Sequence, residues 1–124
     1  MAQSGRFELG LRVLALLARD PNITMTSAAI AEVLDESAVM VRRLFPPLHD
    51  AGLILQKKGP SGGARLKTSP KAIGLGDVFI ALEPEWLLTA DKSLETPMKR
   101  VRADAIAAMN DTTIAGLTKK LKKP

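Results

Sequence analysis

The chain of 124 residues contains no cysteine and only one histidine, His49. Without cysteine there is no disulfide framework, no thiolate nucleophile and no cysteine-ligated zinc or iron–sulfur site. The absence suits a reducing, cytoplasmic compartment. His49 lies near the end of an expected helix, where the helix dipole tolerates a cation, so a structural role is favoured over metal ligation.

Aromatic residues are also scarce, at 3% of the chain, and Trp86 is the only tryptophan. This is too few for the base-stacking platforms of most proteins that bind single-stranded nucleic acids. Trp86 is expected to anchor a core or an interface, and lining an effector pocket is the alternative. Scattered acids, a single histidine and no phosphate-cradling glycine loop at a helix start argue against an enzyme and predict no metal or cofactor.

Long hydrophobic runs are missing as well. The most apolar segment, residues 9–18, follows Glu8, contains Arg12 and is too short to cross a bilayer. It also lacks the cleavage site of a secretory signal. The sequence therefore predicts neither a membrane span nor a secretory leader.

What the sequence does contain is a balance typical of globular proteins, with 46% hydrophobic and 25% charged residues over a length that fits about one domain. The formal charge of +5 is unevenly spread. Residues 40–71 hold one acid, Asp50, against the basic residues Arg42, Arg43, Lys57, Lys58, Arg65, Lys67 and Lys71. Residues 72–95 are instead acidic. This asymmetry indicates a surface for a polyanion, with a solvated face of mixed charge as the alternative.

Hydrophobic spacing predicts three helices in the first half of the chain. Residues 7–17 fit a helix that buries more than one face and ends before Pro21. Two shorter patterns follow between residues 24 and 48, the first capped by Thr26 or Ser27 and the second by Ser37 or Asp35. Their predicted inner faces are Ile30, Val33 and Leu34, and then Val41, Leu44, Phe45 and Leu48.

The candidate binding residues lie on the outer face of the third of these helices. Its core stripe leaves Val39, Met40 and Arg43 facing away, with Arg42 on the flank. Two helices joined by a short turn, with arginine on the outer face of the second, form a helix-turn-helix pattern.

Pro46 and Pro47 fall inside this helix. An interior proline costs about 3 kcal/mol and removes a helical hydrogen bond. A kink between Phe45 and Leu48 is therefore predicted.

A β-hairpin is predicted next. Gly52 suits the left-handed position after a helix, and Leu53 can return a hydrophobic contact to its last turn. The two strands, residues 53–58 and 64–68, flank the turn GPSGG. Its glycines admit backbone amides to phosphates and the lysines and Arg65 supply counter-charge, so this hairpin is read as the wing of a winged helix-turn-helix.

The last third of the chain is expected to be helical with one irregular stretch. A helix follows Gly74, residues 83–97 are irregular, and a helix over residues 96–109 precedes a shorter final one. The apolar stripe of the 96–109 helix is expected to pack on the first helix and on a second subunit. The residues of this predicted dimer interface are Met98, Val101, Ala105 and Met109. The predicted fold is mainly α with a small β-hairpin: a winged helix-turn-helix domain over residues 1–83, then a linker and dimerisation helix region over residues 84–124.

The sequence resembles the Rrf2 family of bacterial transcriptional regulators. The matching segments are SGRFELGLRVLALLA, IAEVL with SAVMVRRLF, AGLI, GPSGGARL and IGLGDVFIALE, in the family's order over roughly residues 4–83. The resemblance implies a homodimer on a palindromic operator, with residues 37–43 in the major groove and residues 57–65 beside it. Many members hold an iron–sulfur cluster on three cysteines, which this chain lacks. The resemblance is therefore to the cysteine-free members, whose effector, where one exists, is a small molecule or a protein of unknown identity.

The predicted function is a sequence-specific regulator that binds double-stranded DNA, with repression as the favoured role. The alternative is a winged-helix module for protein contact without specific DNA binding. Arg42 and Arg43 can read guanine edges or hold phosphates, whereas Val39 and Met40 either touch thymine methyl groups or are ordinary surface residues. The predicted DNA contacts are Thr26, Ser27, Ser37, Val39, Met40, Arg42, Arg43, Lys57, Lys58, Pro60, Ser61, Gly62, Gly63 and Arg65.

Overall fold

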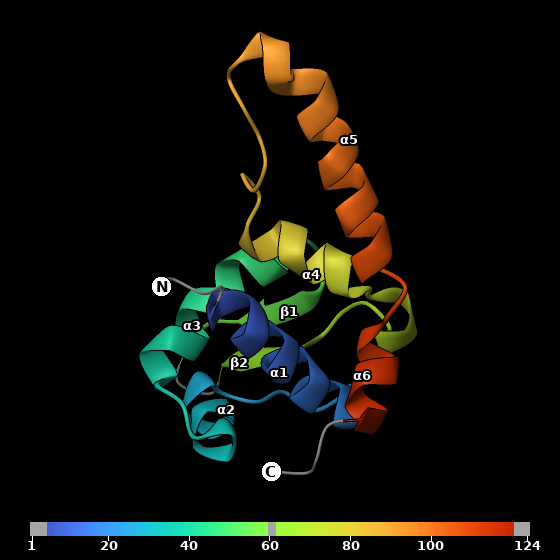
Figure 1. The fold of residues 1–124 in the computed structure, drawn as a ribbon. Coiled ribbons are helices and arrows are strands. Elements are labelled where there is room, and N and C mark those ends of the chain that lie inside the picture. The colour runs from blue at the N-terminus through green and yellow to red at the C-terminus, as the bar shows by residue number, and fades with distance from the viewer. Residues whose placement is uncertain (1–4, 60–61, 121–124) are drawn as a thin grey trace.

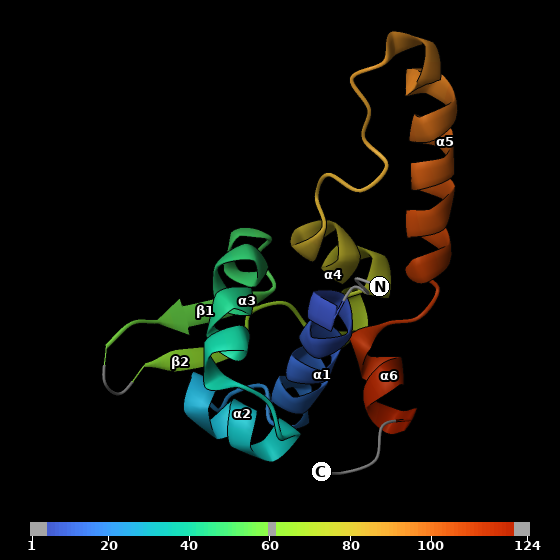
Figure 2. The same ribbon diagram turned by 60° about the vertical axis from the view of Figure 1, so that its left-hand side comes forward.

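The computed structural model describes residues 5–59 and 62–120, which form six α-helices and one two-stranded hairpin at the edge of the helical body (Figures 1 and 2). The predicted fold class, mainly α with a small hairpin, is confirmed. In chain order the elements are α1 (Gly5–Arg19), α2 (Ser27–Leu34), α3 (Ala38–Asp50), β1 (Ile54–Lys57), β2 (Gly63–Leu66), a 3₁₀ turn η1 (Pro70–Ala72), α4 (Leu75–Leu82), α5 (Lys92–Met109) and α6 (Ile114–Lys120).

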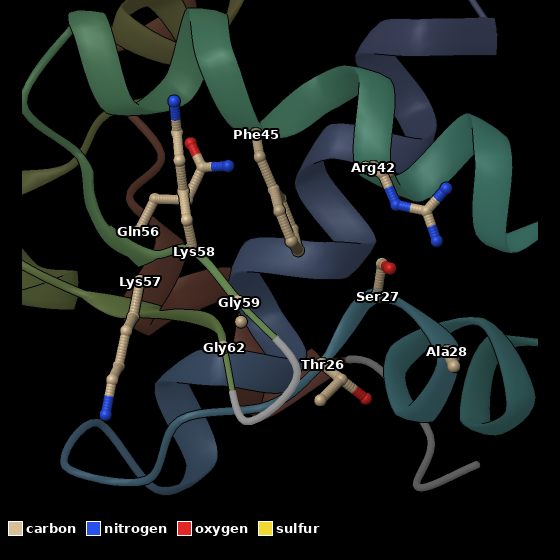
Figure 3. Close-up of a pocket in the computed structure, with 11 residues that line it drawn as sticks. Thr26, Ser27, Ala28, Arg42, Phe45, Gln56, Lys57, Lys58, Gly59 and Gly62 are labelled. Atoms are coloured by element: carbon tan, nitrogen blue, oxygen red, sulfur yellow. The ribbon is translucent and has the colours of Figure 1, made fainter.

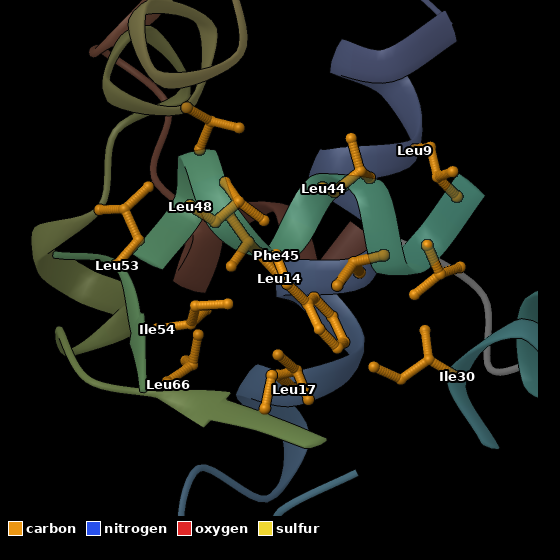
Figure 4. Close-up of a cluster of buried hydrophobic side chains, with 14 of the residues drawn as sticks. Leu9, Leu14, Leu17, Ile30, Leu44, Phe45, Leu48, Leu53, Ile54 and Leu66 are labelled. Carbon is orange, nitrogen blue, oxygen red and sulfur yellow. The ribbon is translucent and has the colours of Figure 1, made fainter. Parts of the chain in front are cut away.

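Helix α1 is the centre of the core. It packs against α2, α3, α4, α6 and β2, and side chains such as Leu14 and Leu17 are almost fully buried (Figure 4). Apolar residues on several of its faces make this possible, and the helix ends two residues before Pro21, as predicted. At Gly10 an added Cβ would meet the side chain of Leu82, so glycine allows α1 and α4 to approach closely.

The helix-turn-helix is built by two hydroxyl caps and one left-handed residue. The Thr26 hydroxyl accepts from the amide of Ala29 at 3.0 Å, and the Ser37 hydroxyl accepts from the amide of Met40 at 3.4 Å. Asp35, with φ of 55°, ends α2 and turns the chain into α3. Of the alternatives that the sequence left open, Thr26 and Ser37 are the caps.

The inner faces of α2 and α3 were predicted with one error. The stripe of α3 is buried at every predicted position, whereas Val33 of α2 is 39% exposed. The buried face of α2 consists instead of Ser27, Ile30 and Ala31. Small residues at the first and fifth positions let this short helix sit close to α3, so Val33 lies on the outer side.

Helix α3 continues through both of its prolines to Asp50. Pro46 is exposed and Pro47 half-buried. The prolines therefore do not end the helix, and the bend between Phe45 and Leu48 stays a prediction.

A glycine stop joins α3 to the hairpin. Gly52 has φ of 78°, its amide donates to the carbonyl of His49, and the amide of Leu53 donates to the carbonyl of Leu48. These two bonds satisfy the last carbonyls of α3, and buried Leu53 closes the predicted hydrophobic contact. The chain then enters β1 directly.

The hairpin is fixed to the body by a second pairing. Ile54 pairs with Leu66 and Lys57 with Gly63 within the hairpin. On its other side, Ala64 exchanges two backbone hydrogen bonds of 2.9 and 2.8 Å with Met25, in the loop before α2. Gly63 has φ of 147°, and an added Cβ would collide with the backbone of Met25. Glycine is therefore required where the hairpin meets this loop.

The C-terminal helices differ from the prediction in two respects. Helix α5 begins at Lys92 rather than near Thr96, because Asp91 accepts from the amide of Ser93 at 2.9 Å and caps it. The helix that packs on α1 is α6, through buried Ile114, whereas α5 packs on α4 and projects from the body (Figures 1 and 2). The predicted division between residues 83 and 84 stays a prediction.

Within residues 5–59 and 62–120, none of the helices has the length and apolar character needed to cross a membrane.

Candidate nucleic-acid interface

A hollow of about 610 Å³ lies where the start of α2, the outer side of α3 and the hairpin converge (Figure 3). The residues that line it come from positions far apart in the sequence. They are Thr26, Ser27, Ala28, Arg42, Phe45, Gln56, Lys57, Lys58, Gly59, Gly62 and Gly63. Seven of the predicted contact residues are among them, so the structure brings the helix-turn-helix and the wing to one concave surface.

The start of α2 offers unpaired hydrogen-bond donors to this hollow. Ser27 is only 9% exposed, yet its hydroxyl has no protein partner in the described part of the chain. The amides of Ser27 and Ala28 likewise donate to no acceptor among the described residues. Backbone amides at a helix N-terminus, with the positive end of the helix dipole, favour a bound anion such as a phosphate.

Arg42 extends from α3 towards Ser27, and Phe45 fills the space behind it (Figure 3). Phe45 is 3% exposed, so its ring lies between the hollow and the core. The guanidinium of Arg42 forms no ion pair in the part of the molecule described. It is an unneutralised cation in a recess, with donors suited to a phosphate or a guanine edge.

The wing residues divide between the two faces of the hairpin. Gln56 and Lys58 turn to the α3 side, whereas Lys57 points away from them (Figure 3). Lys57 and Arg65 line a second, smaller hollow of about 180 Å³ on the far face, beside Thr24 and Leu55. Arg65 therefore does not meet Arg42, because side chains alternate along a strand.

The exposed face of α3 lies beside the hollow. Val39 is 49% and Met40 37% exposed, and Arg43 is exposed without an ion pair in the described residues. Ser37 is exposed at the start of α3, with its hydroxyl engaged as the cap. Val39, Met40 and Arg43 thus lie on the outer face of the first two turns of α3, as the helical spacing predicted.

The turn of the wing is only partly described. Pro60 and Ser61 lie outside the described residues. Gly62 is buried, its amide donates to the carbonyl of Gly59 at 2.9 Å, and an added Cβ would collide with the carbonyl of Lys57. Gly62 therefore closes the turn.

Four residues that line the hollow were not among the predicted contacts: Ala28, Phe45, Gln56 and Gly59. Gln56 pairs with Ala64 across the hairpin, and Ala64 is fully buried, so both side chains share the face that meets α3. The alternation of residues in β1 contained this signal, because Gln56 lies two positions from buried Ile54. Ala28 has a small side chain and enters the site through its backbone, which no side-chain pattern reveals.

The predicted dimer residues lie along a helix that the body leaves largely uncovered. None of the residues of α5 is buried, and Val101 is 53% exposed. Met98, Ala105 and Met109 are half-buried. Leu88 and Leu94, at 59% and 44% exposed, extend the apolar surface near the far end of the helix.

Comparison with known proteins places the chain among transcriptional regulators. The model of the Rrf2 family, described as "Iron-dependent Transcriptional regulator", matches residues 3–123. YffB of Lactococcus lactis, named as an HTH-type transcriptional regulator, is 37% identical over 84 residues, which are 67% of this chain and 54% of YffB. The chain thus spans about half the length of that curated relative.

Solved structures have a similar fold over almost the whole length of this chain. CymR, the global cysteine regulator of B. subtilis, is similar with a TM-score of 0.75 and 26% identity, covering 98% of this chain and 99% of that one. The oxidized form of CymR from Staphylococcus aureus gives a TM-score of 0.72 and 26% identity, covering 99% and 100%. The relatives that are named by function are regulators rather than enzymes.

An iron centre ligated by cysteine does not fit this chain. Its sequence contains no cysteine, and in residues 5–59 and 62–120 there is no group of three or more His, Cys, Asp or Glu that could hold a metal ion. The iron in the family's description therefore has no matching ligand set here.

Proposed function

Because this chain belongs to the Rrf2 family of transcriptional regulators, we propose that it binds double-stranded DNA sequence-specifically as a homodimer and represses transcription at a palindromic operator. The two α3 helices would enter successive major grooves about 34 Å apart, each with a wing beside it. The unit of recognition is one hollow with its neighbouring α3 surface.

The observation that carries the proposal is the gathering of unpaired donors and cations at one concave surface. The start of α2 presents amides and the Ser27 hydroxyl that have no partner among the described residues, α3 presents Arg42, and the hairpin presents Lys58. Amides and cations of this kind hold phosphates and fix register on the duplex. The adjacent side chains of Val39, Met40 and Arg43 are free to meet base edges, which carry the sequence information.

A dimer is supported by the state of α5. The helix has 18 residues and no buried side chain, although it carries an apolar stripe. Isolated amphipathic helices are marginally stable in water unless the apolar face is covered. A second copy of the same stripe would cover it and relate the two hollows by a two-fold axis.

The experiment begins with selection of the operator from genomic fragments, followed by fluorescence anisotropy at two salt concentrations. Arg43→Ala should weaken operator binding by about 1–3 kcal/mol and relax one base position. Lys57→Ala should weaken binding to all duplexes and reduce the salt slope by about one unit. Arg100→Ala, on the exposed surface of α5, removes the same charge outside the hollow and should leave both properties nearly unchanged.

Equal operator affinity for the wild type, Arg43→Ala and Lys57→Ala at both salt concentrations would refute the proposal. The protein-contact alternative makes the opposite prediction, because such a module would show little salt-dependent binding to duplex DNA. Reporter transcription with and without the protein then separates repression from activation.

A further inference from the structure

Arg102 connects α5 to the segment that leads into it. Its Nε donates to the carbonyl of Trp86 at 2.9 Å, and its Nη2 donates to the carbonyl of Pro84 at 3.2 Å. The segment is itself a turn, with the amide of Trp86 donating to the carbonyl of Glu83. One half-buried guanidinium therefore holds two backbone carbonyls, and hydrogen bonds from a charged donor are stronger than neutral ones.

The turn that Arg102 holds also packs against the body of the protein. The Trp86 ring meets Phe79 of α4 edge to face at 5.0 Å, and Phe79 meets Phe7 of α1 in the same way, also at 5.0 Å. Three of the four aromatic residues of the chain lie in this row. The row joins α5 through Arg102 to α4 and to the central helix of the DNA-binding body.

The other attachment of α5 is at its base. Asn110 accepts from the amide of Asp77 at 3.1 Å, and the Asp77 carboxylate accepts from the amide of Gly74 at 2.9 Å. Added Cβ atoms at Gly74 and Gly76 would collide with Asn110 or with the backbone of Ile106, so the base of α5 lies directly on the start of α4. This contact is close but lies at one end of the helix.

Two attachments are needed to fix the direction of a rod. Arg102 lies eight residues before Asn110, about 12 Å along the helix at 1.5 Å per residue. The whole helix is about 27 Å long, so a tilt of about 10° moves its far end by about 5 Å. That displacement exceeds the rise of about 3.4 Å per base pair in DNA.

We propose that Arg102 is a positioning residue, which fixes the direction of α5 relative to α3 and thereby sets the separation of the two half-sites that a dimer can occupy. This inference rests on the proposed function for its consequence at the operator. Its structural part, the direction of α5, is independent of DNA.

The structural part is tested by distances between spin labels in the full-length protein. Because the chain has no native cysteine, labels can be attached at Glu32→Cys on α2 and Lys92→Cys at the start of α5, both exposed positions. Labelled protein is mixed with excess unlabelled protein so that only distances within one protomer are measured. Arg102→Gln should broaden the distance distribution, Arg102→Lys should broaden it less, and Arg100→Gln, which removes an exposed charge two positions away, should leave it unchanged.

The operator part is tested with duplexes that carry the same half-sites at spacings differing by one base pair. Arg102→Gln should reduce discrimination between neighbouring spacings about fivefold, with affinity for a single half-site unchanged, because only the geometry of joint binding is altered. The melting temperatures of Arg102→Gln and Arg100→Gln should agree closely.

An unchanged distance distribution in Arg102→Gln would overturn the inference, and so would an unchanged spacing preference in a protein that binds DNA. If the wild type binds no duplex but Arg102→Gln alone broadens the distances, the role of Arg102 in directing α5 stands and it is the proposed function that fails.

Discussion

The region formed by α2, α3 and the hairpin and the region formed by α5 with its leading segment are held in place by different means. In the first, every helix and strand contributes buried side chains, and β2 is paired on one edge with β1 and on the other with Met25. In the second, α5 has no buried residue and is held by Asn110 at its base and by Arg102. The difference teaches that the proposed DNA-binding surface is set by the core, whereas the direction of α5 depends on a few polar contacts.

The largest expected effect is a loss of stability on substitution in α6, which a matched substitution in α5 should not cause. Ile114 of α6 is fully buried, so Ile114→Ala should lower the free energy of unfolding by about 3 kcal/mol through lost burial and a residual cavity. Val101→Ala, at a position 53% exposed on α5, should change the stability of the isolated protomer by less than about 0.5 kcal/mol. Urea denaturation of both variants at low protein concentration makes the comparison, and equal losses would show that α5 belongs to the core.

A smaller effect is expected at the proposed contact of α5 with a second copy. Val101→Asp would place a carboxylate in the apolar stripe and should raise the dimer dissociation constant about thirtyfold, or about 2 kcal/mol. Ala107 is exposed and lies on the opposite side of α5, so Ala107→Asp adds the same charge away from the stripe. Sedimentation velocity over a concentration series measures both, and dissociation by Ala107→Asp alone would place the interface on the other face.

Smaller effects again are expected on protein stability when the helix caps are removed. Thr26→Ala should lower stability by about 1 kcal/mol, because it leaves the amide of Ala29 without its side-chain acceptor. Ser37→Ala should cost less, since its bond to Met40 is longer, at 3.4 Å against 3.0 Å. Thermal unfolding compares the two, and the reverse order would contradict the assigned strengths of the caps.

The smallest expected effect is the response of α5 to pH. Hydrogen bonds from the side chain and the amide of Ser93 lower the pKa of Asp91 below its ordinary value of 3.8. Because the folded pKa is the lower one, the contribution of Asp91 to helix capping is full well above 3.8 and is lost as pH falls through the lowered pKa. An NMR pH titration of the Ser93 amide should show this transition, and Asp91→Asn should abolish it.

The sequence predicted the first region well because local rules decide it. The 3.6-residue spacing in α3, the hydroxyl caps and the glycine stop each act within a few residues, and all agree with one fold. The start of α5 was misplaced because residues 83–97, with their two prolines, were read as irregular, whereas the Asp91 cap lies earlier in the chain. The predicted site lacked Gln56 for a different reason, because the pairing of β1 with β2 decides on which face of the hairpin each residue lies.

The contacts of Arg102 could not be predicted from the sequence at all. They join a side chain on α5 to carbonyl groups sixteen and eighteen residues earlier, and a carbonyl carries no sequence signature. The same applies to the packing of α6 on α1, which depends on where the short loop after α5 places α6 against the body (Figures 1 and 2). Tertiary contacts of this kind override local spacing.

The two hydrogen bonds between Met25 and Ala64 have a consequence for folding kinetics. They join chain segments on either side of the whole helix-turn-helix, and we expect them to form after α2 and α3 because closing long loops is entropically slow. Amide hydrogen exchange at Met25 and Ala64 should therefore be coupled, with both protons protected together and both released by the same opening event.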